Sequence, residues 1–451
     1  MQKSIVKVCR MNFRRGFSTK AWKNRRSVLL QDEDKIPVDK YRVSGPKDHR
    51  VFVWGLSETG ALGVSTSLWK HKQTYAAFVQ HPTRQSFANS HDVLDVACGY
   101  GFSLFLTKEV KGIQVFGTGI NTDCQVGFHK HGGETNRPME LLVYPAPIEL
   151  PKKSPEEKLK IKSMAAGRAH TILLAESGDI FAMGNNSYGQ LGREIVEGED
   201  YMKSHIIYRF ALENEETSSV YCGQDHTMFL TKSGKVFACG WGADGQNGNG
   251  TYETSGKISQ ALGDIASEKI VKLACAADCV LALSDKGEVF GWGNTEYGQL
   301  SNLGGRVQQI HTPVHLSSLK SLGRITDIAS GGSYCLVLND HGDVFVWGYG
   351  ILGLGPQAEC VLTPKQIPAT LFGRNDFNRN SMVTGIYSGI SHMGAINSDG
   401  DVFMWGVNKH GCLGLGHTKD MYFPFKASLG AKVMKISCGV DHTLALCKAF
   451  V

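Results

Sequence analysis

The sequence predicts an all-β protein: a seven-bladed β-propeller that is closed by pairing of its N- and C-terminal strands in one blade. Three observations carry this prediction. Two short motifs each occur seven times in the 451 residues, successive copies of the first lie 53 to 65 residues apart, and 53 glycines lie mainly at the joints between copies. This interval is just above that of kelch propeller repeats and well above that of helical repeats.

The first motif is a β-branched and aromatic run that ends in glycine, which is typical of a short strand. Each later copy follows a copy of the second motif across a short polar turn that often contains glycine, which favours a tight hairpin. The copies are VFVWG at 51, VFGTG at 115, IFAMG at 180, VFACG at 236, VFGWG at 289, VFVWG at 344 and VFMWG at 402.

The second motif is a turn of small and polar residues that leads into a continuous apolar run, as expected for a strand covered on both faces. Seven sheets that bury both faces are best arranged radially, because this leaves few long edges unpaired. The copies are CGYGFSLFL from Cys98, AGRAHTILL from Ala166, CGQDHTMFL from Cys222, CAADCVLAL from Cys275, SGGSYCLVL from Ser330, SGISHMGAI from Ser388 and CGVDHTLAL from Cys438.

Two copies have no partner in sequence. Nothing precedes VFVWG at 51, and nothing follows the motif that begins at Cys438. We therefore expect these two segments to pair, so that both chain ends build the last blade. An open solenoid would instead need polar caps at its ends, and none is visible.

The amino terminus differs in composition from the rest of the chain. Residues 1–31 contain nine basic residues and no acidic one, and removing them takes the formal net charge from +6 to −3. This pattern predicts a mitochondrial presequence over residues 1–30, with a cleavage motif ending at Phe17, followed by a linker over 31–50 and the propeller over 51–451. The alternative is a basic tail that binds nucleic acid or anionic lipid.

A presequence implies the mitochondrial matrix or the matrix face of the inner membrane. No apolar run reaches the roughly 18 residues of a membrane span, so any membrane association is expected to be peripheral. The near-neutral body gives little support to a dominant phosphate-binding role.

Twelve cysteines raise the question of metal ligands or disulfides. No C-x-x-C pair occurs, and the cysteines that open four copies of the second motif alternate with Ala166, Ser330 and Ser388 at the same position. That position selects small size, so we expect free structural cysteines and assign no metal.

Three further segments continue the repeat: GNNSYGQLG at 184–192, GNTEYGQLS at 293–301 and GVNKHGCLG at 406–414. Together with the two motifs they resemble the regulator-of-chromosome-condensation propellers over about residues 51–450. With the basic amino terminus, the chain is similar to the mitochondrial subgroup of that family. The resemblance implies a monomeric propeller that is not an enzyme and acts without covalent chemistry.

Two G-x-G-x-x-G matches, GWGADG at 240–245 and GYGILG at 348–353, invite a dinucleotide site. Neither opens a helix that could bind a phosphate at its N-terminus, and both are explained by the repeat. We predict no cofactor. A phosphate-binding loop that ends in Gly-Lys-Ser/Thr is absent from the sequence, so the chain is not expected to be a GTPase itself.

The second motif aligns an acidic column next to a histidine column. Each histidine could simply hold a turn by bonding backbone groups. The family resemblance implies more, namely that these side chains lie on one propeller face, engage a small GTPase and stabilise its nucleotide-free form. No catalytic residue is predicted, and Phe102, Cys279 and Tyr334 depart from the pattern. The candidate partner-binding residues are His170, Asp225, His226, Asp278, His392, Asp441 and His442.

Two functions remain open. The first is a guanine-nucleotide exchange factor or binding platform for a mitochondrial GTPase, which the subgroup resemblance suggests is the dynamin-like GTPase of inner-membrane fusion. The second is a scaffold in mitochondrial ribosome assembly that binds ribosomal RNA or its modifying enzymes, for which the lysines of residues 150–162 are available although glutamates interrupt them. We expect the inserts at 64–92 and 128–160 to be surface loops that carry partner specificity.

Overall fold

The structure is a computed structural model, and it describes residues 49–64, 78–130, 137–300 and 307–448. The chain divides into two units, residues 1–46 with residue 451, and residues 47–450. The predicted presequence and nearly all of the predicted linker lie outside the described residues. In the described part, no helix is long or apolar enough to cross a membrane.

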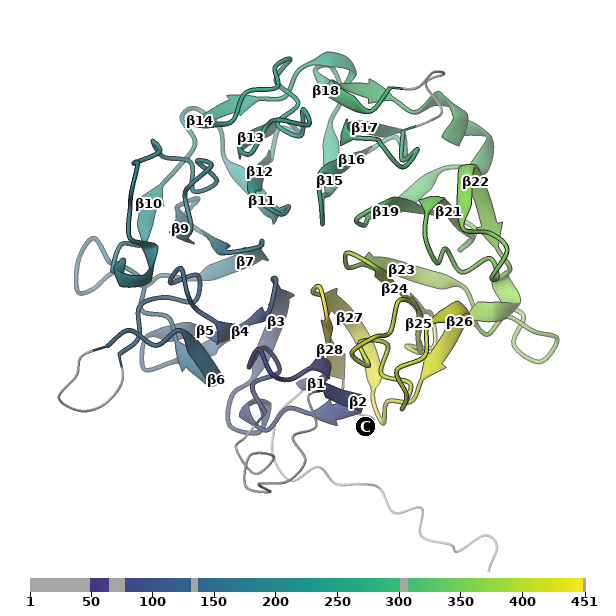
Figure 1. Cartoon of the computed structure of the whole chain (residues 1–451), viewed down its shortest axis with the longest axis horizontal. Helices are drawn as coiled ribbons and strands as arrows, with labels where there is room; N and C mark the ends of the chain where they lie inside the picture. Colours follow the sequence, from purple (N-terminus) through teal and green to yellow (C-terminus); the bar gives the residue numbers. More distant parts are fainter. Residues whose placement is uncertain (1–48, 65–77, 131–136, 301–306, 449–451) are drawn as a thin grey trace, which may run out of the picture. The chain divides into compact units, whose positions relative to one another are not determined.

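The second unit is a ring of seven four-stranded antiparallel sheets, which confirms the predicted propeller (Figure 1). We number the blades in ring order. Blade 1 consists of β3 (Val93–Cys98), β4 (Phe102–Val110), β5 (Ile113–Ile120) and β6 (Leu141–Pro147), and blade 2 of β7 (Ile161–Ala166), β8 (His170–Ala175), β9 (Ile180–Gly184) and β10 (Tyr208–Phe210). Blade 3 consists of β11 (Thr217–Cys222), β12 (His226–Thr231), β13 (Val236–Gly240) and β14 (Ser255–Gln260), and blade 4 of β15 (Ile270–Ala274), β16 (Cys279–Ser284), β17 (Val289–Asn294) and β18 (Gln309–His315).

Blades 5 to 7 have the same plan. Blade 5 consists of β19 (Ile325–Ser330), β20 (Tyr334–Asn339), β21 (Val344–Tyr349) and β22 (Cys360–Ile367), and blade 6 of β23 (Val383–Ser388), β24 (His392–Asn397), β25 (Val402–Gly406) and β26 (Met421–Ala427). Blade 7 consists of β27 (Lys432–Cys438), β28 (His442–Lys448), β1 (His49–Leu56) and β2 (Phe78–Arg84). The helices of the described part are five short 3₁₀ turns, η3 (Phe87–Asn89), η4 (Tyr201–Lys203), η5 (Gly263–Ile265), η7 (Ser317–Leu322) and η8 (Ala369–Phe372).

Within each blade the second motif forms the second strand and the first motif forms the third. In blade 3 the hairpin pairs Leu230 with Val236 next to the turn and His226 with Gly240 at its open end. Gly234 takes a φ of 88° in this turn, a conformation that glycine adopts without strain. The β12 side chains are all buried because neighbouring blades cover both faces of the sheet.

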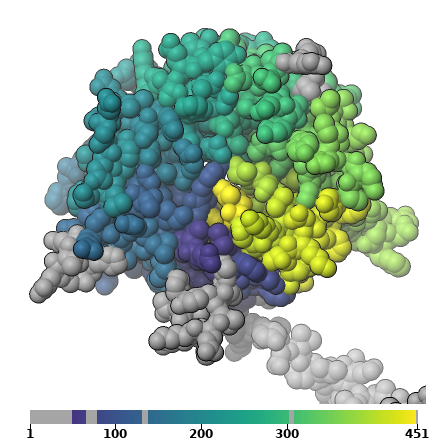
Figure 2. All heavy atoms as spheres, in the orientation of Figure 1, coloured from purple at the N-terminus to yellow at the C-terminus, as the bar shows by residue number. Residues whose placement is uncertain are grey.

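Blade 7 closes the ring as predicted. β28 runs antiparallel to β1, pairing Leu446 with Val51 and Leu444 with Val53, and all four side chains are buried. Figures 1 and 2 show the yellow C-terminal strands beside the purple N-terminal strand. β1 begins at His49, two residues before the expected start of the propeller.

The expected surface loops at 64–92 and 128–160 are partly strands. Residues 78–84 form β2 and residues 141–147 form β6, the outer strands of blades 7 and 1. An outer strand is half exposed and tolerates proline, as in FVQHPTR and LLVYPAP, so its sequence lacks the apolar pattern of the inner strands.

Tryptophans of the first motif connect neighbouring blades. The indole nitrogens of Trp54, Trp292 and Trp347 donate hydrogen bonds of 2.7 to 2.8 Å to loop carbonyls of the preceding blade, those of Cys412, Gln246 and Gln299. All three indoles are fully buried. At each of these three boundaries, one indole N–H group of the repeat therefore joins a blade to the preceding blade.

Candidate functional site

The seven turns of the second motif lie at one end of the ring. Each turn joins the innermost strand to the second strand, and the loop after the third strand begins at the same end, because the register pairs His226 with Gly240 and Tyr334 with Gly348. We call this end the turn face. It carries residues 99–101, 167–169, 223–225, 276–278, 331–333, 389–391 and 439–441, together with the loops that follow the third strands.

The four candidate histidines are buried between blades and do not reach the surface. Three of them share a hydrogen bond with a hydroxyl of the next blade: His170 Nε2 lies 3.1 Å from Thr227 Oγ1, His392 Nε2 3.0 Å from Thr443 Oγ1, and His442 Nε2 2.9 Å from Ser103 Oγ.

The threonine partners indicate which ring nitrogen carries the proton. Thr227 Oγ1 donates its own proton to the carbonyl of Gln190 at 2.6 Å, so it accepts a hydrogen bond from His170. Thr443 Oγ1 likewise donates to the carbonyl of Cys412 at 2.9 Å. His170 and His392 are therefore neutral tautomers protonated at Nε2.

Burial explains the electrostatics of these imidazoles. Loss of hydration lowers the pKa of His170 to about 3 and the pKa values of His226, His392 and His442 to about 4. They are uncharged at neutral pH. In this geometry the histidines belong to the contacts between blades, and the aspartates next to them in sequence face the opposite way.

The three blades that depart from histidine fill the same space differently. The Tyr334 hydroxyl lies 3.0 Å from the carbonyl oxygen of Gly389 and 2.9 Å from that of His392, both in blade 6, so its single proton is shared between the two acceptors. Cys279 places its Sγ 3.9 Å from that of Cys335 in blade 5. Phe102 is fully buried in the same place in blade 1. The position thus requires a side chain that fits against the next blade.

A glycine three residues earlier makes room for each ring. A Cβ atom on Gly223 would overlap the His226 ring, and the same holds for Gly331 beneath Tyr334. Blade 4 has Ala276 at this position and the smaller Cys279 in place of a ring. Glycine and ring therefore occur together for steric reasons.

Asp225 is bonded to an arginine of the preceding blade. Arg168 donates from its Nη2 to Asp225 Oδ2 at 2.6 Å and from its Nε to Asp225 Oδ1 at 3.1 Å. Asp225 is only 8% exposed, whereas the Arg168 side chain is about half exposed. Burial raises the pKa of Asp225, and the charge of Arg168 opposes that shift.

Asp278 lies beside this pair on blade 4. Burial raises its pKa to about 6, with smaller contributions from the negative charges of Asp244 and Asp225, while a 3.0 Å hydrogen bond donated by Gln246 lowers it. The structure therefore brings Asp225 and Asp278 together.

Asp441 is separate from these two. It lies on blade 7, where its Oδ1 is 2.9 Å from His410 Nδ1, and its side chain is 40% exposed. Its side chain is therefore more accessible to a partner than that of the buried Asp225.

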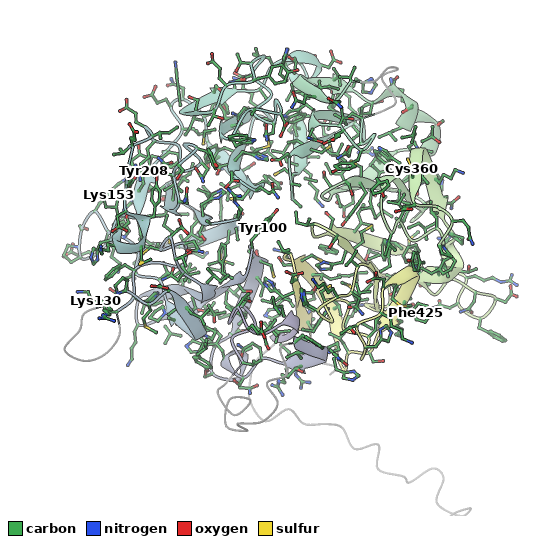
Figure 3. The ribbon with its side chains drawn as sticks, in the orientation of Figure 1. Tyr100, Lys130, Lys153, Tyr208, Cys360 and Phe425 are labelled. Carbon is green, nitrogen blue, oxygen red and sulfur yellow. The ribbon has the colours of Figure 1, made fainter. Side chains whose placement is uncertain are left out.

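Tyr100 and Arg168 also lie on the turn face, and the sequence motifs do not single them out. Tyr100 comes from the blade 1 turn and reaches across the central opening, where its hydroxyl donates to the carbonyl of Ala276 on blade 4 at 3.4 Å (Figure 3). Both residues stand one position before the acidic column. The seven residues at this preceding position range from glycine to arginine, so the position shows no pattern in the sequence.

The central channel below Tyr100 is lined by the innermost strands and has a volume of about 350 Å³. Ion pairs between adjacent blades cross its wall, joining Lys435 to Asp95 at 2.5 Å and Lys272 to Asp327. Because these charges neutralise each other, the channel wall holds the blades together and offers little net charge to a ligand.

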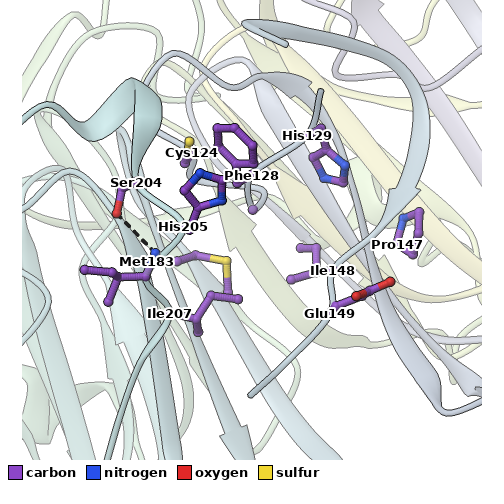
Figure 4. A pocket seen from close by; sticks show the side chains of 12 residues that line it. Cys124, Phe128, His129, Pro147, Ile148, Glu149, Met183, Ser204, His205 and Ile207 are labelled. Atoms are coloured by element: carbon purple, nitrogen blue, oxygen red, sulfur yellow. Dashed lines mark hydrogen bonds between the residues drawn. The ribbon is translucent and has the colours of Figure 1, made fainter. Parts of the chain in front are cut away.

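A second hollow of about 320 Å³ lies between blades 1 and 2 (Figure 4). Ile148 and Met183 form its apolar wall, while His129, Glu149 and His205 supply polar groups. The described residues contain no group of three or more His, Cys, Asp or Glu side chains placed to hold a metal ion.

These features define a class: a closed propeller of seven four-stranded blades with buried imidazoles between blades and an acidic turn face. The family model described as "RCC1-like domain" matches residues 210–449, and that of the "Regulator of chromosome condensation (RCC1) repeat" matches residues 48–106 and 177–230. The chain belongs to the RCC1-like family of repeat propellers, as the motifs predicted.

Curated relatives agree with this assignment. The chain is 40% identical over 433 residues to a mouse "RCC1-like G exchanging factor-like protein", covering 94% of this chain and 93% of the relative, and 39% identical to the human protein of that name over 92% and 91%. A mitochondrial RCC1 domain-containing protein of Arabidopsis thaliana, RUG3, is 26% identical over 89% of each chain.

Solved structures have the same fold. The crystal structure of human WBSCR16 is 40% identical and matches with a TM-score of 0.83, covering 90% of this chain and all of that one. Prp20p of Saccharomyces cerevisiae, described with its binding to Gsp1p and histones, matches with a TM-score of 0.71 at 20% identity and covers 90% of this chain and 93% of that one. At that identity the likeness shows the fold alone.

Proposed function

We propose that the chain is a guanine-nucleotide exchange factor, or a binding platform, for a mitochondrial GTPase that docks on the turn face. The observation that carries the proposal is the cluster of Arg168, Asp225 and Asp278 beside the central opening, with Asp441 on the opposite part of the same face. The names of the mouse and human relatives, which refer to a G exchanging factor, support the same reading.

The exchange would need no covalent step. A propeller that binds the nucleotide-free GTPase more tightly than the loaded one must, by linkage, weaken nucleotide binding. Asp441 is accessible to a cationic or amide group of the partner, and Asp225 becomes so if the partner draws the exposed Arg168 away. The buried histidines act as positioning residues that fix the turns from behind.

The partner is proposed to be the dynamin-like GTPase of inner-membrane fusion, in the matrix or at the matrix face of the inner membrane. The basic and acid-free composition of residues 1–31 supports a mitochondrial location, and the Arabidopsis thaliana relative carries the description mitochondrial.

The test measures release of a fluorescent guanosine diphosphate from GTPases that copurify with the full chain from mitochondria. We expect the wild-type chain to accelerate release and the Asp225→Asn/Asp441→Asn variant to lose most of that acceleration. Asp376→Asn is the matched control, because its side chain is highly exposed and lies in the segment between η8 and β23, which enters the blade from the other end. Unchanged acceleration by the double variant would contradict the assignment of the face.

A scaffold for ribosome assembly is the second candidate, and no contact specifically favours it. Three of the five lysines of residues 150–162 are engaged within the protein: Lys153 pairs with Asp179 at 3.1 Å, Lys160 with Glu176 at 2.6 Å, and Lys162 donates to the carbonyl of Thr217 at 3.0 Å. Purification with and without RNase decides between the two, since RNase-sensitive recovery of ribosomal proteins would support the scaffold.

A further inference from the structure

Five aromatic side chains lie in an arc on the turn face across blades 2 to 5. Tyr188 meets Trp241 edge to face with centroids 4.8 Å apart, Tyr252 meets His311 of the next blade at 4.8 Å, and Tyr297 stacks on Tyr349 at 5.9 Å. We call Tyr188, Trp241, Tyr252, Tyr297 and Tyr349 the aromatic arc.

The backbone places the arc beside the acidic column. The amide of Trp241 donates to the carbonyl of Asp225 at 2.8 Å, and that of Tyr349 donates to Ser333 at 2.9 Å. Tyr252, Tyr297 and Tyr349 are 45%, 43% and 42% exposed, and Trp241 is partly exposed. Large rings with this much free surface are available to a partner.

Blade packing does not require aromatic residues here. At the boundary of blades 1 and 2, the positions equivalent to Tyr188 and Trp241 are Asp123 and Asn185, which meet through a 2.8 Å hydrogen bond. A polar pair therefore serves the same boundary contact. The exposed rings in blades 2 to 5 need another explanation.

The arc is also acidic. Asp244, Glu253, Glu296 and Glu359 lie in the loops that carry its rings, and Glu359 accepts a 2.9 Å hydrogen bond from the Tyr349 hydroxyl. The loop segments 241–254, 294–300 and 349–360 contain no lysine or arginine. The loop of Tyr188, residues 185–207, has two basic residues and four acidic ones, namely Arg193, Lys203, Glu194, Glu197, Glu199 and Asp200. Arg168, at the blade 2 end of the arc, is paired with Asp225.

We propose that the aromatic arc binds a lysine- or arginine-containing segment of a partner protein. Cationic side chains would lie over the ring faces, with the loop carboxylates as counter-charges, a combination that stabilises guanidinium and ammonium groups. The inference deepens the proposed function by giving the chemistry of the docking partner, and it rests on that function only in placing the partner on the turn face.

Single-stranded RNA is the competing ligand, since bases also stack on exposed aromatic rings. The carboxylates decide against it. RNA binding needs a positively charged groove for the phosphates, whereas the described loops of the arc present negative charge.

The test uses the full chain and three fluorescent probes measured by anisotropy. These are a twelve-residue Gly-Ser peptide with four arginines, the same peptide with glutamates in their place, and a twelve-nucleotide oligouridylate. We expect the arginine peptide to bind best, and its affinity to fall as the salt concentration rises.

Paired variants locate the binding. Tyr297→Leu/Tyr349→Leu should weaken binding of the arginine peptide about tenfold, and Tyr297→Phe/Tyr349→Phe should keep it within about threefold, because phenylalanine retains the ring face. Phe377→Leu/Phe425→Leu is the control, since these exposed rings lie outside the arc, Phe377 in the segment between η8 and β23 and Phe425 on the outer strand β26. Thermal unfolding of each variant confirms that it is folded.

Two results would overturn the proposal: unchanged peptide binding in the folded leucine pair, or preferential binding of the oligouridylate. The nucleotide-release assay separates this failure from failure of the proposed function. Accelerated release with no effect of the leucine pair on peptide binding leaves the exchange function standing without the arc. Peptide binding as expected, with no GTPase responding, leaves the arc standing without the exchange function.

Discussion

The Nε2 atom of His442 lies 2.9 Å from the Oγ atom of Ser103, which joins the C-terminal strand of blade 7 to the second strand of blade 1, across a sequence separation of 339 residues. Both side chains are buried, so neither can exchange its partner for water. The same contact recurs between other blades with threonine in place of serine.

Ser103→Ala should lower the free energy of unfolding by about 1 to 3 kcal/mol, because it leaves a buried imidazole nitrogen without a partner. Ser103→Thr is the control, since threonine fills this place in blades 2, 3 and 7 and keeps the hydroxyl. Equilibrium unfolding in urea measures both. Equal stability of the alanine variant and the wild type would show that the contact between blades 7 and 1 does not depend on this hydrogen bond.

Val280→Thr should stabilise the protein by about 1 kcal/mol. His226 faces blade 4, where Val280 stands in the position of the threonines, and neither ring nitrogen of His226 has a hydrogen-bond partner. A threonine there can accept from His226 and donate to a loop carbonyl, as Thr227 does. Val346→Thr is the control in the same unfolding measurement. It buries a hydroxyl group at a position with no imidazole partner, so it should lower the free energy of unfolding.

Gly223→Ala should destabilise blade 3, because the added methyl group overlaps the His226 ring. Gly223→Ala/His226→Cys recreates the Ala276 and Cys279 pair of blade 4 and should recover part of the loss. A double-mutant cycle with the two single variants measures the coupling. Strictly additive effects on the free energy of unfolding would refute the steric link.

Acidification should destabilise the fold between about pH 6.5 and pH 4. The folded-state pKa values of the four buried histidines lie at about 3 to 4, whereas an unfolded histidine titrates near about 6.5. In this window the unfolded state binds protons that the native state does not, so the free energy of unfolding falls as the pH falls. Asp225 and Asp278, whose pKa values are raised, oppose the effect, but they are outnumbered.

The measurement is the dependence of unfolding free energy on pH. His392→Gln should reduce the slope by up to one proton near pH 5, and His341→Gln is the control because His341 is largely exposed. A slope of opposite sign, with stability rising towards pH 4, would mean that the carboxyls dominate.

The fold could be predicted because each blade repeats the same two strands, and the unpaired copies at 51 and 438 had only each other to pair with. The direction in which the histidine side chains point, towards the next blade, could not be predicted. Asp225 lies in the turn just before β12 and His226 is the first residue of that strand, but which side chain faces the next blade depends on how whole sheets stack. The contact of Tyr188 with Trp241 likewise depends on two loops from different blades. The prediction of loops at β2 and β6 is wrong because half-exposed edge strands carry a weak sequence pattern.

The β1 and β28 ladder has one mechanical consequence. His49 pairs with Lys448, so the beginning of β1 and the end of β28 lie at the same end of the ladder. Tension applied between these two residues loads the hydrogen bonds one after another, as in opening a zipper, instead of all together in shear. A translocase or protease that pulls on the N-terminal segment while the C-terminal end is held would therefore separate β1 from β28 pair by pair and open the ring at blade 7.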